Sequence, residues 1–177
     1  YVQAKENSGE VDECIDVIIG NNKKKDLIEI LEQHIQKAVI DINHTKEYEE
    51  MHLSKTAEHT RAYIKVQDGC NQFCTYCIIP FARGRVRSRA KEDVIREVTD
   101  LANNGYKEVV LTGIHLSSYG VDLEGEDLLS LILAVNDVAG IERIRLGSLE
   151  PRIITEEFAK TIAGLTKMCP HFHLSLQ

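Results

Sequence analysis

Three closely spaced cysteines constrain this chain more than any other feature. Cys70, Cys74 and Cys77 follow the pattern C-x₃-C-x₂-C in a chain of 177 residues with five cysteines. Thiolates are soft ligands that suit iron–sulfur clusters or zinc. A structural zinc site is normally closed by four protein ligands, whereas a cubane held by three cysteines keeps one iron open. The spacing therefore predicts a [4Fe–4S] cluster with an exchangeable iron.

Two other interpretations of the cysteines stay open. A zinc knuckle would need Cys14, Cys169 or a histidine as its fourth ligand, and no second cysteine pair has zinc-ribbon spacing. A disulfide framework is less favoured, because the number of cysteines, five, is odd and a chain of this length can bury a hydrophobic core without disulfide bonds. Grouped unpaired cysteines indicate a reducing compartment, so the expected location is the cytoplasm.

The composition is that of a globular protein, with 43% hydrophobic and 28% charged residues. No apolar run approaches the roughly 18 residues that a membrane helix needs, so no membrane partner is expected. The net charge of −7, from 21 basic and 28 acidic side chains, argues against nucleic-acid binding through overall charge. It leaves room for a local basic patch.

Such a patch directly follows the cysteines. The segment Arg83–Lys91 has five positive charges and no acidic residue. Its arginines fall at every second position and would point to one side of an extended segment. Arginine forks match phosphate and carboxylate geometry, so a polyanion or a cofactor carboxylate is a candidate ligand, and a solvated basic loop is the alternative. The candidates are Arg83, Arg85, Arg87 and Arg89.

Apolar periodicity predicts alternating strands and helices. The predicted strands are 14–20, 61–67, 107–113, 142–148 and 171–176, and the predicted helices are 24–37, 91–104, 126–139 and 155–165. Such alternation favours an α/β fold with a parallel sheet that right-handed crossovers curl toward a barrel. The expected architecture is therefore the first half of a parallel (β/α) barrel. Ligands should bind at the carboxyl ends of its strands, in loops that start at Asp68, Gly113 and Ser148.

The chain also contains sequence motifs of a known family. Six short segments closely resemble the radical S-adenosylmethionine (SAM) methylthiotransferases: Lys65–Pro80, Arg83–Gly84, Arg87–Arg89, Leu111–His115, Tyr119–Gly120 and His173–Gln177. The forms Thr112–His115 and Ser148–Pro151 are most similar to the branch that modifies N6-threonylcarbamoyladenosine beside the anticodon of tRNA. The isopentenyladenosine branch and the ribosomal-protein branch are alternatives, as is a non-catalytic metal-binding RNA module.

The resemblance implies three segments. Residues 1–40 would be the tail of an α/β methylthiotransferase amino-terminal domain, 41–60 a linker, and 61–177 a truncated radical SAM core. A second cluster is expected in a part of the full-length protein that this chain does not contain, so the chain alone should be unable to complete methylthiolation. The implied partners are the tRNA anticodon stem-loop and a reducing electron donor, with SAM as methyl donor and radical source.

The resemblance also suggests roles for single residues. Cys70, Cys74 and Cys77 would hold the cluster, and no residue is assigned as a catalytic acid or base. Tyr76 would lie near the SAM adenine, and Gly113 would offer backbone groups to the methionine amine. Other SAM or substrate candidates are Ser148 and Glu150 at the ribose or methionyl end, His115 at the cavity rim and, weakly, Gln177.

Overall fold

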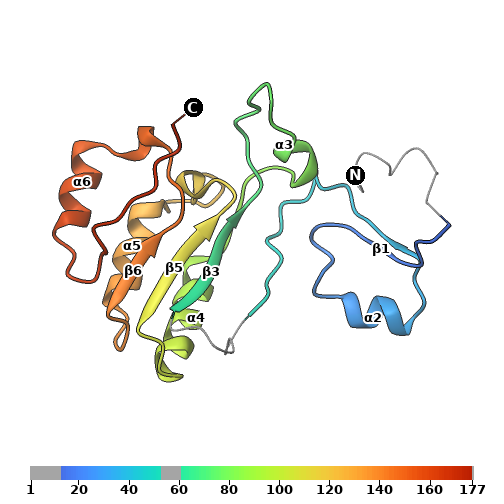
Figure 1. Cartoon of the computed structure of the whole chain (residues 1–177), viewed down its shortest axis with the longest axis horizontal. Helices are drawn as coiled ribbons and strands as arrows, with labels where there is room; N and C mark the ends of the chain where they lie inside the picture. Colours follow the sequence, from blue (N-terminus) through green and yellow to red (C-terminus); the bar gives the residue numbers. More distant parts are fainter. Residues whose placement is uncertain (1–12, 53–60, 177) are drawn as a thin grey trace. The chain divides into compact units, whose positions relative to one another are not determined.

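The computed structural model describes residues 13–52 and 61–176 (Figure 1). The chain forms two compact units. The first contains the described residues up to Met51 together with Gly69–Arg85. The second contains the described residues of His52–Asp68 and those from Val86 onward. Residues 53–60 of the predicted linker, and Gln177, lie outside the described residues.

The first unit contains a small β-α-β motif. Strand β1 (Ile18–Ile19) and strand β2 (Lys37–Ala38) are parallel, and helix α2 (Leu27–Glu32) connects them. The predicted strand and helix are therefore present but shorter than expected. The helix stops early because His34 adopts a left-handed φ of 55°, after which Ile35 and Gln36 lead into β2.

The segment that carries the three cysteines packs with this motif. Its short helix α3 (Ile79–Ala82) accepts a hydrogen bond at the Ala82 carbonyl from the side-chain amide of Asn21, at 2.7 Å. The Arg83 guanidinium donates to the side-chain oxygen Oδ1 of Asn21 at 3.4 Å. The predicted domain boundaries assigned the cysteine segment to the barrel, whereas its contacts here group it with the first unit. The boundaries themselves stay a prediction.

The second unit is built on a four-stranded sheet. Its strands are β3 (Arg61–Asp68), β4 (Arg87–Ser88), β5 (Glu108–Gly113) and β6 (Arg143–Leu146), in the order β4-β3-β5-β6. The strands β3, β5 and β6 are parallel to one another, which confirms the expected parallel sheet. Strand β4 was not expected. It runs antiparallel to β3, with Gln67 opposite Ser88 and Asp68 opposite Arg87.

Three helices bury their apolar faces in one core with this sheet. They are α4 (Lys91–Asn103), α5 (Leu128–Asp137) and α6 (Glu156–Ala163), each within two residues of its predicted bounds. Single turns of 3₁₀ helix, Leu116–Ser118 and Pro151–Ile153, follow β5 and β6. The core is made of branched aliphatic side chains from both strands and helices, such as Val98, Leu111 and Ile132. No helix in the described part of the chain is long and apolar enough to cross a membrane.

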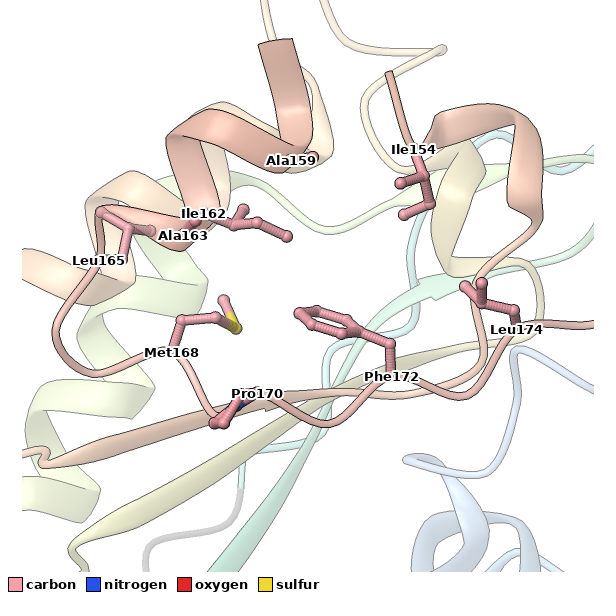
Figure 2. Close-up of a pocket in the computed structure, with 9 residues that line it drawn as sticks. All are labelled: Ile154, Ala159, Ile162, Ala163, Leu165, Met168, Pro170, Phe172 and Leu174. Carbon is pink, nitrogen blue, oxygen red and sulfur yellow. The ribbon is translucent and has the colours of Figure 1, made fainter. Parts of the chain in front are cut away.

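The prediction of a regular strand at 171–176 is wrong, because these residues form an isolated bridge and no strand. The segment beyond α6 meets the sheet only through two isolated parallel bridges, Ile144 to Met168 and Leu149 to Leu174. An apolar groove of about 440 Å³ lies between this segment and α6. In Figure 2, Met168 and Phe172 point into the groove from the segment, and Ile162 faces them from the helix. The segment thus follows β6 in direction without forming a regular strand.

Candidate functional site

The three cysteines lie in the loop Gly69–Arg85, which we call the cluster loop. It begins directly after β3. A Cβ atom at Gly69 would lie 1.8 Å from the Arg85 carbonyl oxygen, and Gly69 has a left-handed φ of 72°. The Cys70 backbone N–H donates to the Gly84 carbonyl at 3.1 Å. The two ends of the cluster loop therefore touch, and only glycine fits at position 69.

None of the three cysteines forms a disulfide, and they differ in burial. Cys70 is buried, whereas Cys74 and Cys77 are partly exposed. The Gln72 backbone N–H donates to the Cys70 sulfur at 3.5 Å, and the Cys77 N–H donates to the Cys74 carbonyl at 2.9 Å. Hydrogen bonds from backbone N–H groups to ligand sulfurs are a common means of tuning iron–sulfur clusters.

The three cysteine thiols are chemically suitable ligands for a cubane [4Fe–4S] cluster. Each thiolate of a cubane binds its own iron, so the sulfurs surround the cluster and need not converge on one point. Among residues 13–52 and 61–176, no three histidine, cysteine or carboxylate side chains lie close enough together to hold one metal ion. The three thiols of the cluster loop, two of them partly exposed, are the ligand type that a cluster requires.

Tyr76 lies on the same loop and is accessible. Its side chain is 75% exposed, so a planar ligand could reach its ring. Partial desolvation, and then the neighbouring Cys74 thiol, raise the pKa of the Tyr76 phenol above 10.0. The phenol therefore stays neutral at physiological pH.

In the second unit, the candidates at the carboxyl ends of the strands are organised by Gln67, near the end of β3. The fully buried Gln67 accepts a hydrogen bond from the His115 backbone N–H at 2.8 Å and donates to the Asp68 carbonyl at 2.9 Å. A Cβ at Gly113 would lie 2.8 Å from the Gln67 side-chain oxygen. Gly113 therefore leaves room for Gln67, which in turn fixes the backbone at His115.

His115 and Glu150 are brought together. The His115 Nε2 and the Glu150 Oε2 are 3.2 Å apart, and their side chains are only 21% and 28% exposed. The other ring nitrogen of His115 lies 2.6 Å from the Ser118 hydroxyl. Arg152 also pairs with Glu150, at 2.6 Å. The carboxylate of Glu150 is thus held between two potential cations at the ends of β5 and β6.

Ser148 lies at the same edge of the sheet. Its hydroxyl is 2.7 Å from the His173 Nδ1. The neighbouring Glu150 backbone N–H donates to the Ser117 hydroxyl at 2.9 Å. The structure therefore gathers Gly113, His115, Ser148 and Glu150 into one polar region, as their positions after β5 and β6 predict.

Sequence reasoning missed four residues of this region. For Gln67, the available signal was a polar residue close to the end of a strand that is otherwise part of the core. For Ser117 and Ser118, the signal was a pair of serines shortly after the candidate His115. The fourth belongs to the last family motif without a role of its own. They are Gln67, Ser117, Ser118 and His173.

The prediction that four arginines share one exposed side is wrong. Arg87 is completely buried and lies 3.6 Å from the carboxylate of Asp68. Arg89 is also buried and pairs with Glu97. Pairing of β4 with β3 turns this part of the basic run into the protein interior. Arg83 and Arg85 are only partly buried, so they stay candidates for substrate contact.

The family model that matches this sequence is that of the Radical SAM superfamily, over residues 64–177. The match covers the cysteines, the parallel sheet and the polar region described above. The chain belongs to the radical SAM superfamily. Its α/β fold, with a half barrel of parallel strands, is the fold that the sequence predicted.

Relatives of the chain include two kinds of tRNA methylthiotransferase. The chain is 42% identical over 168 residues to the threonylcarbamoyladenosine tRNA methylthiotransferase MtaB of Aquifex aeolicus, which covers 92% of the chain and 41% of the relative. It is 41% identical over 168 residues to the tRNA-2-methylthio-N(6)-dimethylallyladenosine synthase of Thermoanaerobacter pseudethanolicus, covering 92% of the chain and 36% of the relative. The chain thus spans about two fifths of the length of these relatives. The resemblance to methylthiotransferases is confirmed.

A solved structure shares the fold. The radical SAM methyltransferase TsrM from Kitasatospora setae, solved with tryptophan substrate and a SAM analogue bound, matches with a TM-score of 0.51 and 22% sequence identity. The match covers 65% of this chain and 21% of that chain. This likeness shows the radical SAM fold alone.

Proposed function

We propose that this chain forms the cluster-binding and SAM-binding part of a tRNA methylthiotransferase. The observation that carries the proposal is the C-x₃-C-x₂-C pattern in a loop that begins directly after β3 of a radical SAM sheet. The named relatives, which match 92% of the chain, support the choice of methylthiolation among radical SAM reactions.

In this proposal Cys70, Cys74 and Cys77 hold a [4Fe–4S] cluster. When bound, the cluster and SAM supply the one-electron chemistry that an unactivated C–H bond requires. The chain's own residues bind and orient. The Gln72 N–H would tune one ligand sulfur, and the exposed ring of Tyr76 would lie near the adenine of SAM.

In the same proposal, the polar region of the second unit supplies the SAM contacts that the resemblance implies for it. Gly113 presents backbone groups to the methionine amine, and Ser148 and Glu150 accept hydrogen bonds from the ribose hydroxyls or the amine. Because His115 and Arg152 already contact the Glu150 carboxylate, Glu150 reaches SAM in a fixed orientation. His115 then acts as a positioning residue at the rim of the site.

We further propose N6-threonylcarbamoyladenosine, in the tRNA anticodon stem-loop, as the substrate. The forms Thr112–His115 and Ser148–Pro151 support this choice, as does the Aquifex relative. A reducing electron donor and a cytoplasmic location belong to the same proposal. We propose that the complete reaction uses a second cluster in addition to the one held by Cys70, Cys74 and Cys77.

Dimethylallyladenosine is the second candidate substrate. A specific observation favours it: the chain is 49% identical over 118 residues to the tRNA-2-methylthio-N(6)-dimethylallyladenosine synthase of Alkaliphilus oremlandii, which covers 66% of the chain and 25% of the relative. This segment is the most similar stretch among the relatives described above.

The test is expression of the complete open reading frame that contains this sequence, in a bacterial strain without tRNA methylthiotransferases, followed by mass spectrometry of the tRNA nucleosides. We expect 2-methylthio-N6-threonylcarbamoyladenosine from the wild-type gene and none from a Cys74→Ala variant. Cys169→Ala is the matched control, because it removes a buried cysteine outside the cluster loop. The dimethylallyl product would replace the first substrate by the second, and the absence of any methylthio nucleoside would refute the proposed function.

A further inference from the structure

The cluster loop carries a group of rings and charge that the predicted cofactor roles do not use. Phe73 and Phe81 meet edge to face, with ring centroids 5.7 Å apart and planes at 81°. The guanidinium carbon of Arg85 lies 4.4 Å from the centroid of the Phe73 ring. We call Phe73, Phe81 and Arg85 the aromatic platform. All three lie within the cluster loop, so the platform belongs to one unit of the structure.

The platform is accessible. Phe73 is 42% exposed and Phe81 is 54% exposed. Neighbouring exposed aromatic side chains leave apolar area in water, which is typical of binding surfaces. Phe73 also has a left-handed φ of 51°. A bulky residue adopts this conformation at an energetic cost, and such strain is concentrated at functional sites.

The charge of the cluster loop favours an anionic partner. The segment Gly69–Arg85 contains two arginines and no acidic residue, in a chain with a net charge of −7. Aromatic rings and guanidinium planes are the groups on which RNA-binding proteins stack unpaired bases, while nearby cations contact the phosphates. Bases within a duplex are already stacked and cannot use such a surface. The chemistry of the platform therefore fits a single-stranded RNA segment.

We propose that Phe73, Phe81 and Arg85 form a stacking platform for an unpaired base of the RNA substrate. The proposal deepens the proposed function and rests on it, since the ligand is the substrate RNA of that function. Phe81 supplies the more exposed ring, and Arg85 holds Phe73 by a cation–π contact while it presents positive charge to the neighbouring phosphate. None of the three platform side chains is a proposed cluster ligand, so variants at Phe81 and Arg85 should leave the cluster in place.

The test is RNA binding by the chain with its cluster reconstituted, in the presence of saturating SAM. The probe is an RNA hairpin with 2-aminopurine in place of one loop adenine, whose fluorescence is quenched by stacking. We expect Phe81→Leu, which removes the ring but keeps apolar volume, to weaken hairpin binding by about tenfold and to reduce the quenching. Arg85→Lys, which keeps the charge but loses the planar stack, should also reduce the quenching.

Tyr63→Leu is the matched control. Tyr63 is a 56% exposed aromatic residue on β3, in the other unit, and its replacement should change neither affinity nor quenching. Iron content is measured for every variant, and Arg85→Lys provides the test if Phe81→Leu loses iron. The same RNA annealed to its complement should bind more weakly and should not respond to Phe81→Leu.

Four results would each overturn the platform. In the first, hairpin binding and quenching do not change in the two platform variants; in the second, Phe81→Leu weakens binding of the duplex as much as binding of the hairpin. In the third, the variants lose SAM affinity without losing RNA affinity. In the fourth, their oligomeric state changes while their RNA affinity does not. The last would assign the surface to a protein partner. If methylthio nucleosides form in cells but Phe81→Leu does not change hairpin binding, the platform is refuted and the proposed function stands. If no methylthio nucleoside forms, the proposed function itself is refuted.

Discussion

The buried ion pair between Arg89 and Glu97 gives the sharpest test of how the basic run folds. The Arg89 side chain is 4% exposed and that of Glu97 is 3% exposed. Replacing Arg89 by methionine keeps much of its volume but leaves the Glu97 carboxylate buried. The His52 Nδ1 lies 4.0 Å from the same carboxylate, and the His52 side chain is 43% exposed. Breaking a buried pair in this way costs about 3–5 kcal/mol.

Urea unfolding followed by far-ultraviolet circular dichroism measures this loss, because the chain has no tryptophan for fluorescence. With a slope of about 2 kcal/mol per molar urea, a loss of about 4 kcal/mol lowers the midpoint by roughly 2 M. The Tyr119 hydroxyl, which donates to the Arg89 backbone carbonyl at 2.9 Å, keeps its partner in the variant. The substitution therefore leaves this backbone contact in place.

The double variant Arg89→Met/Glu97→Leu is the control. It removes both charges, so it should regain most of the stability that the single variant loses. If Arg89→Met unfolds at the wild-type midpoint, the buried pair is not stabilising and the reasoning is refuted. If that variant is also stable but loses affinity for RNA, Arg89 is a substrate contact, as the sequence pattern first predicted.

Three further outcomes follow from the structure. Cys74→Ala should lose the iron and the visible absorbance of the reconstituted chain, and full iron content in this variant would contradict the ligand assignment. Glu108 is buried, and hydrogen bonds from Arg143 and Arg145 hold the pKa of its carboxyl below 4.5. The stabilisation by the Glu108 carboxylate is therefore present above pH 4.5 and is lost as the pH falls through the lower pKa of the folded protein. The Glu108→Gln variant should unfold more easily at neutral pH, and its stability should fall less as the pH is lowered. Equal pH profiles of stability in the variant and the wild type would exclude this role. Gly113→Ala should weaken SAM binding in equilibrium dialysis, because its Cβ would displace the Gln67 side chain; unchanged affinity would show that the site tolerates this shift.

The parts of the fold that sequence predicts are those with a strong local period. Helix α4 starts at its predicted residue because Val94, Val98 and Leu101 form one apolar face. Helix α5 begins after Asp127, whose side chain accepts from the Ser130 N–H in a capping box. The prediction of a [4Fe–4S] cluster at the three cysteines likewise comes from their spacing in the sequence.

The parts that sequence missed depend on contacts between distant residues. Arg87 and Arg89 have the alternation of an exposed basic strand, yet both are buried, beside Asp68 and Glu97 respectively. Nothing near Arg87 in sequence reveals that partner. Residues 171–176 have strand-like composition, yet they form one bridge to Leu149 and no ladder, because a strand needs a partner in register and not only a pattern.

The closed base of the cluster loop has a consequence for how such a protein can change. The loop leaves the sheet after Asp68 and returns to it at Arg87, which lies opposite Asp68. A loop whose ends are already held together can be lengthened at little cost, about 0.6 kcal/mol for each doubling of its length. The segment between the two ends is therefore a replaceable insert: its sequence can diverge, and with it the group that it carries, while the sheet that holds it remains the same.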